Sequence, residues 1–145
     1  MTVRRLAPHA TTIFTEVSRL ATRFDAINLG QGFPDTDGPE SMIEAAVRAL
    51  RDGHNQYPPG SGIPELRHAI VADETARTGL VHDPDTETLV TVGATEAIAA
   101  AVVGLVEYDD EVVVIEPYYD SYVAAVAMAG ATRRAARLIR SGGHI

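Results

Sequence analysis

The sequence predicts an α/β fold: part of a mixed, largely parallel sheet with helices on both faces, preceded by an N-terminal arm. Residues 112–115 form the continuous apolar run Val-Val-Val-Ile, which is typical of a strand buried on both faces of a parallel sheet. Residues 88–105 have the pattern of a strand, a tight turn and a helix with one apolar face. Strands and helices that alternate in this way are the pattern of an α/β domain.

Composition indicates a globular chain of one domain. Its 145 residues are 46% hydrophobic, which is enough for a single core. No apolar run reaches the length of a membrane span, and no apolar signal core follows the N-terminal arginines. The chain has no cysteine, and therefore neither a disulfide nor a thiolate metal site. We expect a cytoplasmic protein without a metal site, and the net charge of −8 argues against nucleic acid or an anionic membrane as a partner.

The cationic side chains are all arginines, 12 in total, and the sequence contains no lysine. This excludes from the chain every mechanism that needs a lysine amine, including a covalent bond to a carbonyl cofactor and a phosphate-binding P-loop. The last acidic residue is Asp120, and residues 141–145 have neither a helical pattern nor a cap. We therefore expect a chain that was cut short, or one whose last residues left the expected reading frame.

Three helices are predicted before the central turn. The first covers residues 12–22, the second begins at Pro39 and ends near Gly53, and the third covers about residues 64–77 and is stopped by Gly79. Each helix has apolar residues at helical spacing. They are Ile13, Val17 and Leu20 with Phe14 beside them, then Ile43, Val47 and Leu50, and finally Leu66 and Ile70.

Two loops next to these helices carry candidate ligand-binding residues. Residues 27–35 are predicted to form a short strand and a loop in which Gly30 and Gly32 let the backbone approach a ligand closely. Residues 54–62 form a stiff, extended loop, since each proline in it fixes its own φ, and Tyr57 is therefore held outward. The alternatives are an ordinary surface loop for the glycines and a half-buried packing residue for the tyrosine.

The central turn, Gly93-Ala94, leads into a predicted helix with Thr95 at its start. Thr95 is expected to cap this helix, because its hydroxyl can accept a hydrogen bond from a first-turn N–H. Small residues in front of a helix N-terminus leave N–H groups and the positive end of the dipole accessible to a phosphate. The alternative is that Gly93 only makes a turn between a strand and a helix.

Three tyrosines, Tyr118, Tyr119 and Tyr122, lie where the apolar strand ends and another helix begins. Open α/β sheets bind their ligands at the carboxyl ends of their strands, so this cluster is a second candidate site. Packing of the tyrosines against the sheet is the alternative. The helix is expected to end by Gly130, before a further strand within residues 131–139.

Four motifs, in this order, closely resemble those of the class I/II, fold-type I aminotransferases. They are Asn28-Leu29-Gly30-Gln31-Gly32-Phe33-Pro34, Asn55-Gln56-Tyr57, Thr91-Val92-Gly93-Ala94-Thr95-Glu96-Ala97 and Glu116-Pro117-Tyr118-Tyr119-Asp120-Ser121-Tyr122. The chain looks most like the branch that holds kynurenine, methionine and succinyl-diaminopimelate aminotransferases. The resemblance covers residues 5–137 but only the N-terminal part of the family's length. It implies an arm with a substrate-side loop in residues 1–35 and a partial, truncated cofactor-binding large domain in residues 36–145.

The resemblance also implies which residues would bind pyridoxal 5'-phosphate. Ala94 and Thr95, next to Gly93, match the phosphate-binding positions of the family. Tyr119 matches the aromatic residue that stacks on the pyridine ring. Tyr57 matches the tyrosine that reaches the partner's phosphate in a homodimer, and Gly32 matches the loop glycine beside the substrate carboxylate.

The rest of the family's catalytic apparatus lies downstream of residue 145, and no catalytic residue is assigned here. It comprises the lysine that holds the cofactor, an Asn-Pro motif, the aspartate at the pyridinium nitrogen, the tyrosine at the ring oxygen and the arginine that binds the substrate carboxylate. Arginine cannot replace the lysine, because it stays protonated near neutral pH. The resemblance implies that the complete enzyme moves an amino group between an amino acid and a 2-oxo acid. The fragment alone is expected to be inactive and to bind the cofactor weakly.

Three other functions remain open from the residues. Relatives with this fold perform β-elimination from sulfur amino acids, which shares its carbanion with transamination. The chain can also be a decayed or truncated gene product without catalysis, or a small α/β binding module. A dinucleotide-binding domain is disfavoured, because the turn at residues 92–97 lacks the repeated glycines of that fingerprint.

Overall fold

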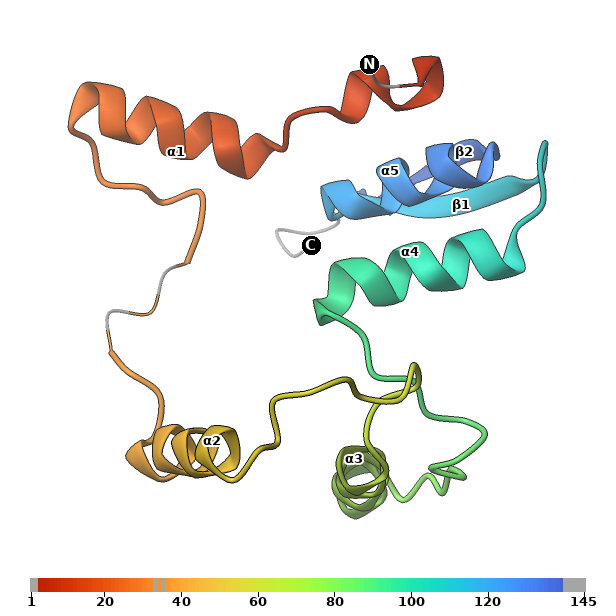
Figure 1. Cartoon of the computed structure of the whole chain (residues 1–145). Helices are drawn as coiled ribbons and strands as arrows, with labels where there is room; N and C mark the ends of the chain where they lie inside the picture. Colours follow the sequence, from red (N-terminus) through yellow and green to blue (C-terminus); the bar gives the residue numbers. More distant parts are fainter. Residues whose placement is uncertain (1–2, 33, 35, 140–145) are drawn as a thin grey trace. The chain divides into compact units, whose positions relative to one another are not determined.

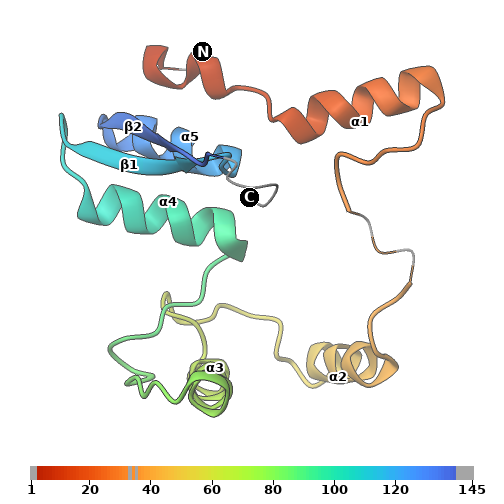
Figure 2. The ribbon, with the colours of Figure 1, turned by 180° about the vertical axis from the view of Figure 1, so that it is seen from behind.

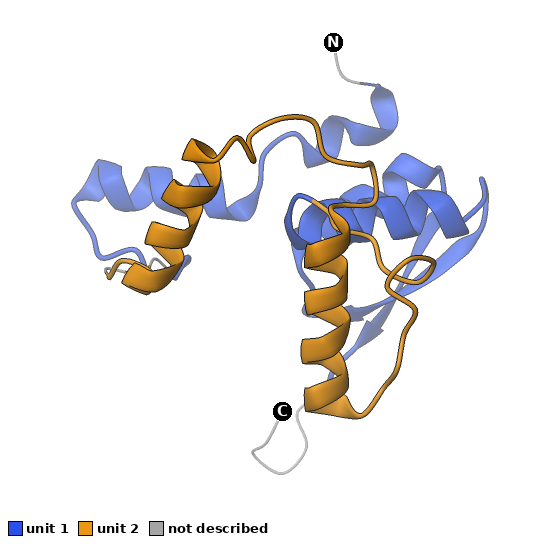
Figure 3. Cartoon of the chain, turned by 60° about the horizontal axis from the view of Figure 1, so that its bottom comes forward, with its two compact units in different colours: residues 1–32, 92–145 blue, residues 33–91 orange. Residues whose placement is uncertain are grey.

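The computed structural model describes residues 3–32, 34 and 36–139 of the chain. Its elements, labelled in Figure 1, are η1 (Arg4–His9), α1 (Ile13–Phe24), α2 (Glu40–Arg51), α3 (Pro64–Thr78), α4 (Gly93–Leu105), β1 (Glu111–Glu116), α5 (Asp120–Ala129) and β2 (Thr132–Arg137). They form two compact units, which are described separately: Met1–Gly32 with Val92–Ile145, and Phe33–Thr91 (Figure 3). The expectations for Phe33, Asp35 and the tail from Arg140 onwards fall outside the described residues. No described helix is both long and apolar enough to cross a membrane.

The first unit is built on two parallel strands joined by a helix. β1 and β2 pair with Val114 opposite Ala135, and α5 connects the two strands (Figures 1 and 2). α5 packs on the sheet and α4 packs along α5. The buried apolar residues are Val114, Ala125 and Val126, which lie on β1 and α5. The predicted α/β class is confirmed, and so is a strand within residues 131–139.

The apolar run in β1 is buried on one face of the strand. Val114 is 6% exposed, whereas its neighbours Val113 and Ile115 are 68% and 59% exposed. Successive side chains of a strand point to opposite faces, so α5 covers one face and no element of the described chain covers the other. The prediction that this strand is buried on both faces is therefore wrong for the chain as described.

The N-terminal helix forms where its pattern predicts, and a loop folds back onto it. Thr12 caps α1 by accepting a hydrogen bond from the N–H of Thr15 at 3.2 Å. Asn28, in the loop that follows, donates to the Ser18 hydroxyl at 3.0 Å and accepts from the Gly30 N–H at 3.0 Å. These bonds hold residues 28–30 on the side of the helix.

In the second unit, the two predicted helices are confirmed. α2 starts directly after Pro39, which lies at the cap position instead of the first helical position. α3 ends at Gly79, which takes the left-handed conformation with φ +76°. Arg67 of α3 is buried, and its guanidinium pairs with Asp85 at 3.0 Å. This ion pair ties the loop after α3 back to the helix.

Two predicted strands do not form. Residues 27–29 are extended without a partner strand in the described chain, and Ile27 and Leu29 are 87% and 90% exposed. In residues 88–91 the Val90 N–H donates to the Ser61 carbonyl at 3.1 Å, and these residues form no strand. A β-branched sequence favours an extended backbone, but a strand also requires a hydrogen-bonding neighbour.

Gly62 is the most constrained glycine of the second unit. Its φ is +94°, and a Cβ at this position would lie 2.5 Å from Cγ2 of Val90. We expect Gly62→Ala to lower the free energy of unfolding by about 2 kcal/mol, because it adds both backbone strain and a steric clash. Urea unfolding followed by circular dichroism measures the change.

Gly60→Ala is the matched control. A Cβ at Gly60 would meet nothing within 4 Å, so this substitution should change the free energy of unfolding by less than about 0.5 kcal/mol. Equal effects of the two substitutions would contradict the packing of Gly62 against Val90.

Candidate functional site

The N-terminus of α4 lies in the turn that the sequence singles out. The helix begins at Gly93, which has φ +77° and open space where a Cβ would lie. Thr95 is inside the first turn, so the prediction that it caps the helix is wrong. The carboxylate of Glu96 reaches back instead and accepts a hydrogen bond from the N–H of Val92. The Thr95 hydroxyl therefore remains available for another partner.

That partner is Tyr119, which lies at the end of the loop between β1 and α5, directly before the first residue of α5. The Thr95 and Tyr119 hydroxyl oxygens lie 3.1 Å apart, although 24 residues separate them in the sequence. The structure thus brings together the turn in front of α4 and the tyrosine cluster after β1.

Two aromatic rings hold the ring of Tyr119 in place. Tyr122 packs edge-on at a centroid distance of 5.9 Å with an interplanar angle of 88°, and Phe14 of α1 lies at 6.2 Å with an angle of 52°. Offset and edge-to-face contacts of this kind fix the orientation of an aromatic side chain. The Tyr119 side chain is still 39% exposed, so part of the ring remains accessible.

Neighbouring hydroxyls also alter the acidity of Tyr119. Hydrogen bonds with the side chains of Ser121 and, to a smaller extent, Thr95 lower the pKa of the phenol below its ordinary value. Partial desolvation and the negative charge of Asp120 act in the opposite direction. The direction of the shift means that the neighbouring hydroxyls stabilise the phenolate form of Tyr119.

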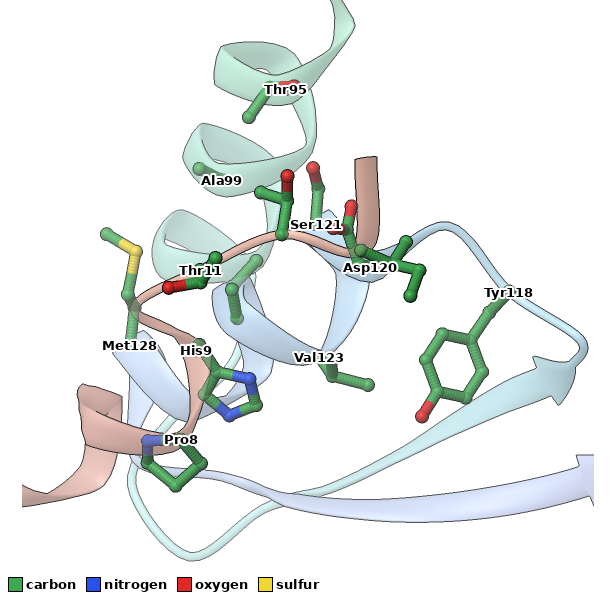
Figure 4. A pocket seen from close by; sticks show the side chains of 14 residues that line it. Pro8, His9, Thr11, Thr95, Ala99, Tyr118, Asp120, Ser121, Val123 and Met128 are labelled. Atoms are coloured by element: carbon green, nitrogen blue, oxygen red, sulfur yellow. The ribbon is translucent and has the colours of Figure 1, made fainter. Parts of the chain in front are cut away.

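A cavity of about 560 Å³ lies beside this hydroxyl pair. It is lined by Thr12, Phe14, Thr15 and Ser18 of the arm, by Gln31, and by Thr95, Tyr119, Asp120 and Ser121. A second cavity of about 500 Å³ shares Thr95, Asp120 and Ser121 and extends towards η1, where His9 and Met128 line it (Figure 4). Hydroxyl and apolar groups make up most of both linings, and the carboxylate of Asp120 belongs to both.

Five of the predicted site residues belong to the first unit, and Tyr57 belongs to the second. Gly93, Ala94, Thr95 and Tyr119 belong to one compact unit, and the Thr95–Tyr119 contact joins their two segments. Gly32 ends the loop whose Gln31 lines the cavity, and open space surrounds its Cβ position.

Tyr57 belongs to the second unit and is 98% exposed, which excludes the alternative of a half-buried packing residue. Gly30 is close to α1: a Cβ there would lie 2.5 Å from Cγ1 of Val17. Its small size serves packing against this helix, whereas the loop sequence predicts that it lets the backbone approach a ligand.

Three residues of the site were not predicted from the sequence. Phe14 lies beside the apolar stripe of α1, and its position off the stripe was the signal that it contacts another part of the chain. Ser121 and Asp120 are part of the tyrosine motif, but nothing in their spacing indicates that one would bond to Tyr119 and both would line the cavities.

The donors at this site fit a phosphate group. The first amides of a helix have no carbonyl partner in a preceding turn, and the helix dipole adds positive potential there. The hydrogen-bonded pair of Thr95 and Tyr119 hydroxyls adds one further free donor beside the small residues Gly93 and Ala94. The accessible part of the Tyr119 ring suits a flat aromatic group. The residues present therefore fit pyridoxal phosphate, while the sequence provides no lysine to hold it covalently.

These features define an α/β protein with a candidate ligand site where a helix N-terminus lies next to the carboxyl end of a parallel strand. Residues 25–143 match the family described as aminotransferase class I and II, and the chain belongs to this family. Members of this family generally depend on pyridoxal phosphate.

Similar proteins are much longer than this chain. The probable N-succinyldiaminopimelate aminotransferase DapC of Mycobacterium tuberculosis is 61% identical over 142 residues, which are 98% of this chain and 36% of that protein. The methionine aminotransferase of Escherichia coli is 45% identical over 126 residues, which are 87% of this chain and 33% of that protein.

Two solved structures are also similar to this chain, and both are of much longer proteins. The N-succinyldiaminopimelate aminotransferase of Mycobacterium tuberculosis superposes with a TM-score of 0.92 at 60% identity, covering 98% of this chain and 37% of that one. The Escherichia coli protein YbdL, which has a methionine aminotransferase function, has a TM-score of 0.88 at 40% identity, covering 100% of this chain and 38% of that one. The chain thus has the fold of the corresponding part of these enzymes.

The acidity of Tyr119 gives a test of the site's geometry. We expect the Tyr119 phenol to titrate below the ordinary tyrosine pKa, and Ser121→Ala to raise its pKa, since this removes the strongest of the hydrogen bonds that lower it. NMR titration of ¹³C-labelled tyrosine, with Tyr119→Phe used for assignment, measures both values. The exposed Ser41→Ala is the control and should leave the Tyr119 titration unchanged. An ordinary pKa in the unsubstituted chain would contradict the hydroxyl cluster.

Proposed function

We propose that this chain provides the phosphate-binding turn and the ring-stacking face of a pyridoxal-phosphate-dependent aminotransferase. The observation that carries the proposal is the contact between Thr95 and Tyr119, which unites two motifs of the family around one cavity. Because the chain spans 36% of the length of its Mycobacterium tuberculosis relative, the activity of the whole enzyme is also part of the proposal.

Each residue has a distinct task in this proposal. The N–H groups of Ala94 and Thr95 and the Thr95 hydroxyl bind the phosphate, and Gly93 leaves room for it. Tyr119 covers one face of the ring, excludes water there and fixes the plane of the ring. When bound, pyridoxal phosphate supplies the electron sink that stabilises a carbanion at the substrate's Cα.

Two further residues act on the substrate side and at the subunit interface. Gly32 lies by the substrate carboxylate, where a side chain would obstruct it. Tyr57, fully exposed and followed by two prolines, reaches the phosphate site of the second subunit in a homodimer. In this proposal residues 1–35 act as arm and substrate-side loop, and residues 36–145 as part of the cofactor-binding domain.

The covalent anchor comes from outside this sequence, because arginine stays protonated and cannot fill that role. The resemblance assigns the movement of the substrate's proton to the same lysine. The substrates are an amino acid and a 2-oxo acid. The relatives are named as aminotransferases of succinyldiaminopimelate, methionine and aspartate, which favours transamination over β-elimination and leaves the amino donor open.

A chimera tests the proposed function. The segment of the Mycobacterium tuberculosis relative that matches this chain is replaced by residues 3–139 of this chain. We expect the chimera to bind pyridoxal phosphate and to exchange amino groups between an amino acid and a 2-oxo acid. The 145-residue chain alone should not catalyse this exchange. Absorbance of the bound cofactor and formation of the new amino acid are the two readouts.

Thr95→Val in the chimera should weaken cofactor binding about 10-fold, because a hydrogen bond to a charged group is lost. Thr132→Val, on the exposed strand β2, is the matched control and should have no effect. If Thr95→Val leaves the affinity unchanged, the turn before α4 is not the phosphate site.

A further inference from the structure

Stacking on a cofactor ring explains the aromatic ring of Tyr119 but not its hydroxyl, since a phenylalanine would stack equally well. In this structure the hydroxyl lies 3.1 Å from the hydroxyl of Thr95, at the helix N-terminus proposed to hold the phosphate. The side chain therefore reaches both halves of the proposed cofactor site.

The orientation of this hydroxyl is built into the fold. Phe14 and Tyr122 fix the ring from two directions, and Ser121 forms a hydrogen bond that acts on the phenol. The rings of Phe14 and Tyr122 thus fix the ring of Tyr119, while the hydroxyls of Thr95 and Ser121 act on its phenolic oxygen. Such convergence costs side-chain entropy, which a surface tyrosine without a function would not need to lose.

We propose that Tyr119 is a positioning residue for the phosphate group of an aromatic compound that carries an alkyl phosphate monoester, with its O–H donating to the Thr95 oxygen so that Thr95 directs its own proton to the phosphate. This inference rests on the proposed function of the site. It extends the role of Tyr119 from the ring of the cofactor to its phosphate.

The direction of donation follows from acidity. A phenol is a stronger donor than an aliphatic hydroxyl, and donation from Tyr119 leaves the Thr95 proton free for the most negative acceptor nearby, the phosphate. Hydrogen bonds in such a chain polarise one another, so the Thr95–phosphate bond becomes stronger than it would be alone.

The arrangement predicts a specific pH dependence. Loss of the phenolic proton removes the donor and places a negative charge beside the phosphate, so cofactor affinity should fall as pH rises through the lowered pKa of Tyr119. The groups that face Tyr119 from α1 and α4 are neutral, Phe14 and Thr95. Those from α5 are Asp120, whose charge opposes the shift, and the phenol of Tyr122.

Binding of two probes to the 145-residue chain tests the inference by equilibrium dialysis at millimolar concentrations. Pyridoxal phosphate carries the phosphate and pyridoxal lacks it. We expect Tyr119→Phe to weaken pyridoxal phosphate binding about 5-fold and to leave pyridoxal binding unchanged, because only a hydroxyl is removed. Tyr119→Leu should weaken the binding of both probes, since it also removes the ring. Tyr108→Phe, at an exposed tyrosine outside both cavities, is the control.

Two further readouts separate positioning from packing. Tyr119→Phe combined with Thr95→Val should weaken binding no more than Thr95→Val alone, because Tyr119 acts through Thr95. The alkaline fall in affinity should be steeper in the unsubstituted chain than in Tyr119→Phe.

The outcomes distinguish the two proposals. If Thr95→Val weakens pyridoxal phosphate binding but Tyr119→Phe does not, the inference about Tyr119 is wrong and the proposed phosphate site stands. If the unsubstituted chain does not bind pyridoxal phosphate more tightly than pyridoxal, the proposed function and the inference about Tyr119 are both wrong.

Discussion

The hydrogen bond between Thr95 and Tyr119 is the contact on which the site depends, and the core of the first unit determines whether it can form. Thr95 is fixed to α4, and Tyr119 follows β1. The two oxygens meet because α4 packs along α5 and α5 packs on the sheet. Val114, Ala125 and Val126, the buried apolar residues of the described chain, hold these layers together. Close packing in this small core therefore sets a distance between two polar groups outside it.

The arm is the third component of the site. Phe14 fixes the ring of Tyr119 from the side of α1, while the bond from Asn28 to Ser18 keeps the next loop on the same helix. As a result Gln31 lines the cavity together with residues of the arm and of α5. A helix that contributes no fully buried residue thus shapes the site through one ring contact and one hydrogen bond.

Local patterns predicted the local structure well. Helical spacing identified α1, α2 and α3, and the glycines at positions 79 and 130 end their helices in the left-handed conformation as expected. The strand predicted at residues 88–92 failed because pairing depends on a neighbour that local sequence does not specify. The cap predicted at Thr95 failed because Gly93 lets the helix begin three residues earlier, with Val92 at the cap position. The Thr95–Tyr119 contact was accessible to sequence reasoning only through resemblance, since it joins residues 24 positions apart.

The charges around the two cavities do not balance those of a phosphate group. A phosphate monoester brings up to two negative charges, but no arginine lines either cavity in the described part of the chain, and Asp120 adds a negative charge to both. Hydroxyls, amides and a helix dipole stabilise an anion without neutralising it, and the dipole acts only within the first turn. A full counter-charge must therefore approach from outside these cavities. In the proposed function this chain orients its ligand through hydrogen bonds, and the charged and covalent contacts that retain the ligand, including the lysine that this sequence lacks, come from another part of the enzyme.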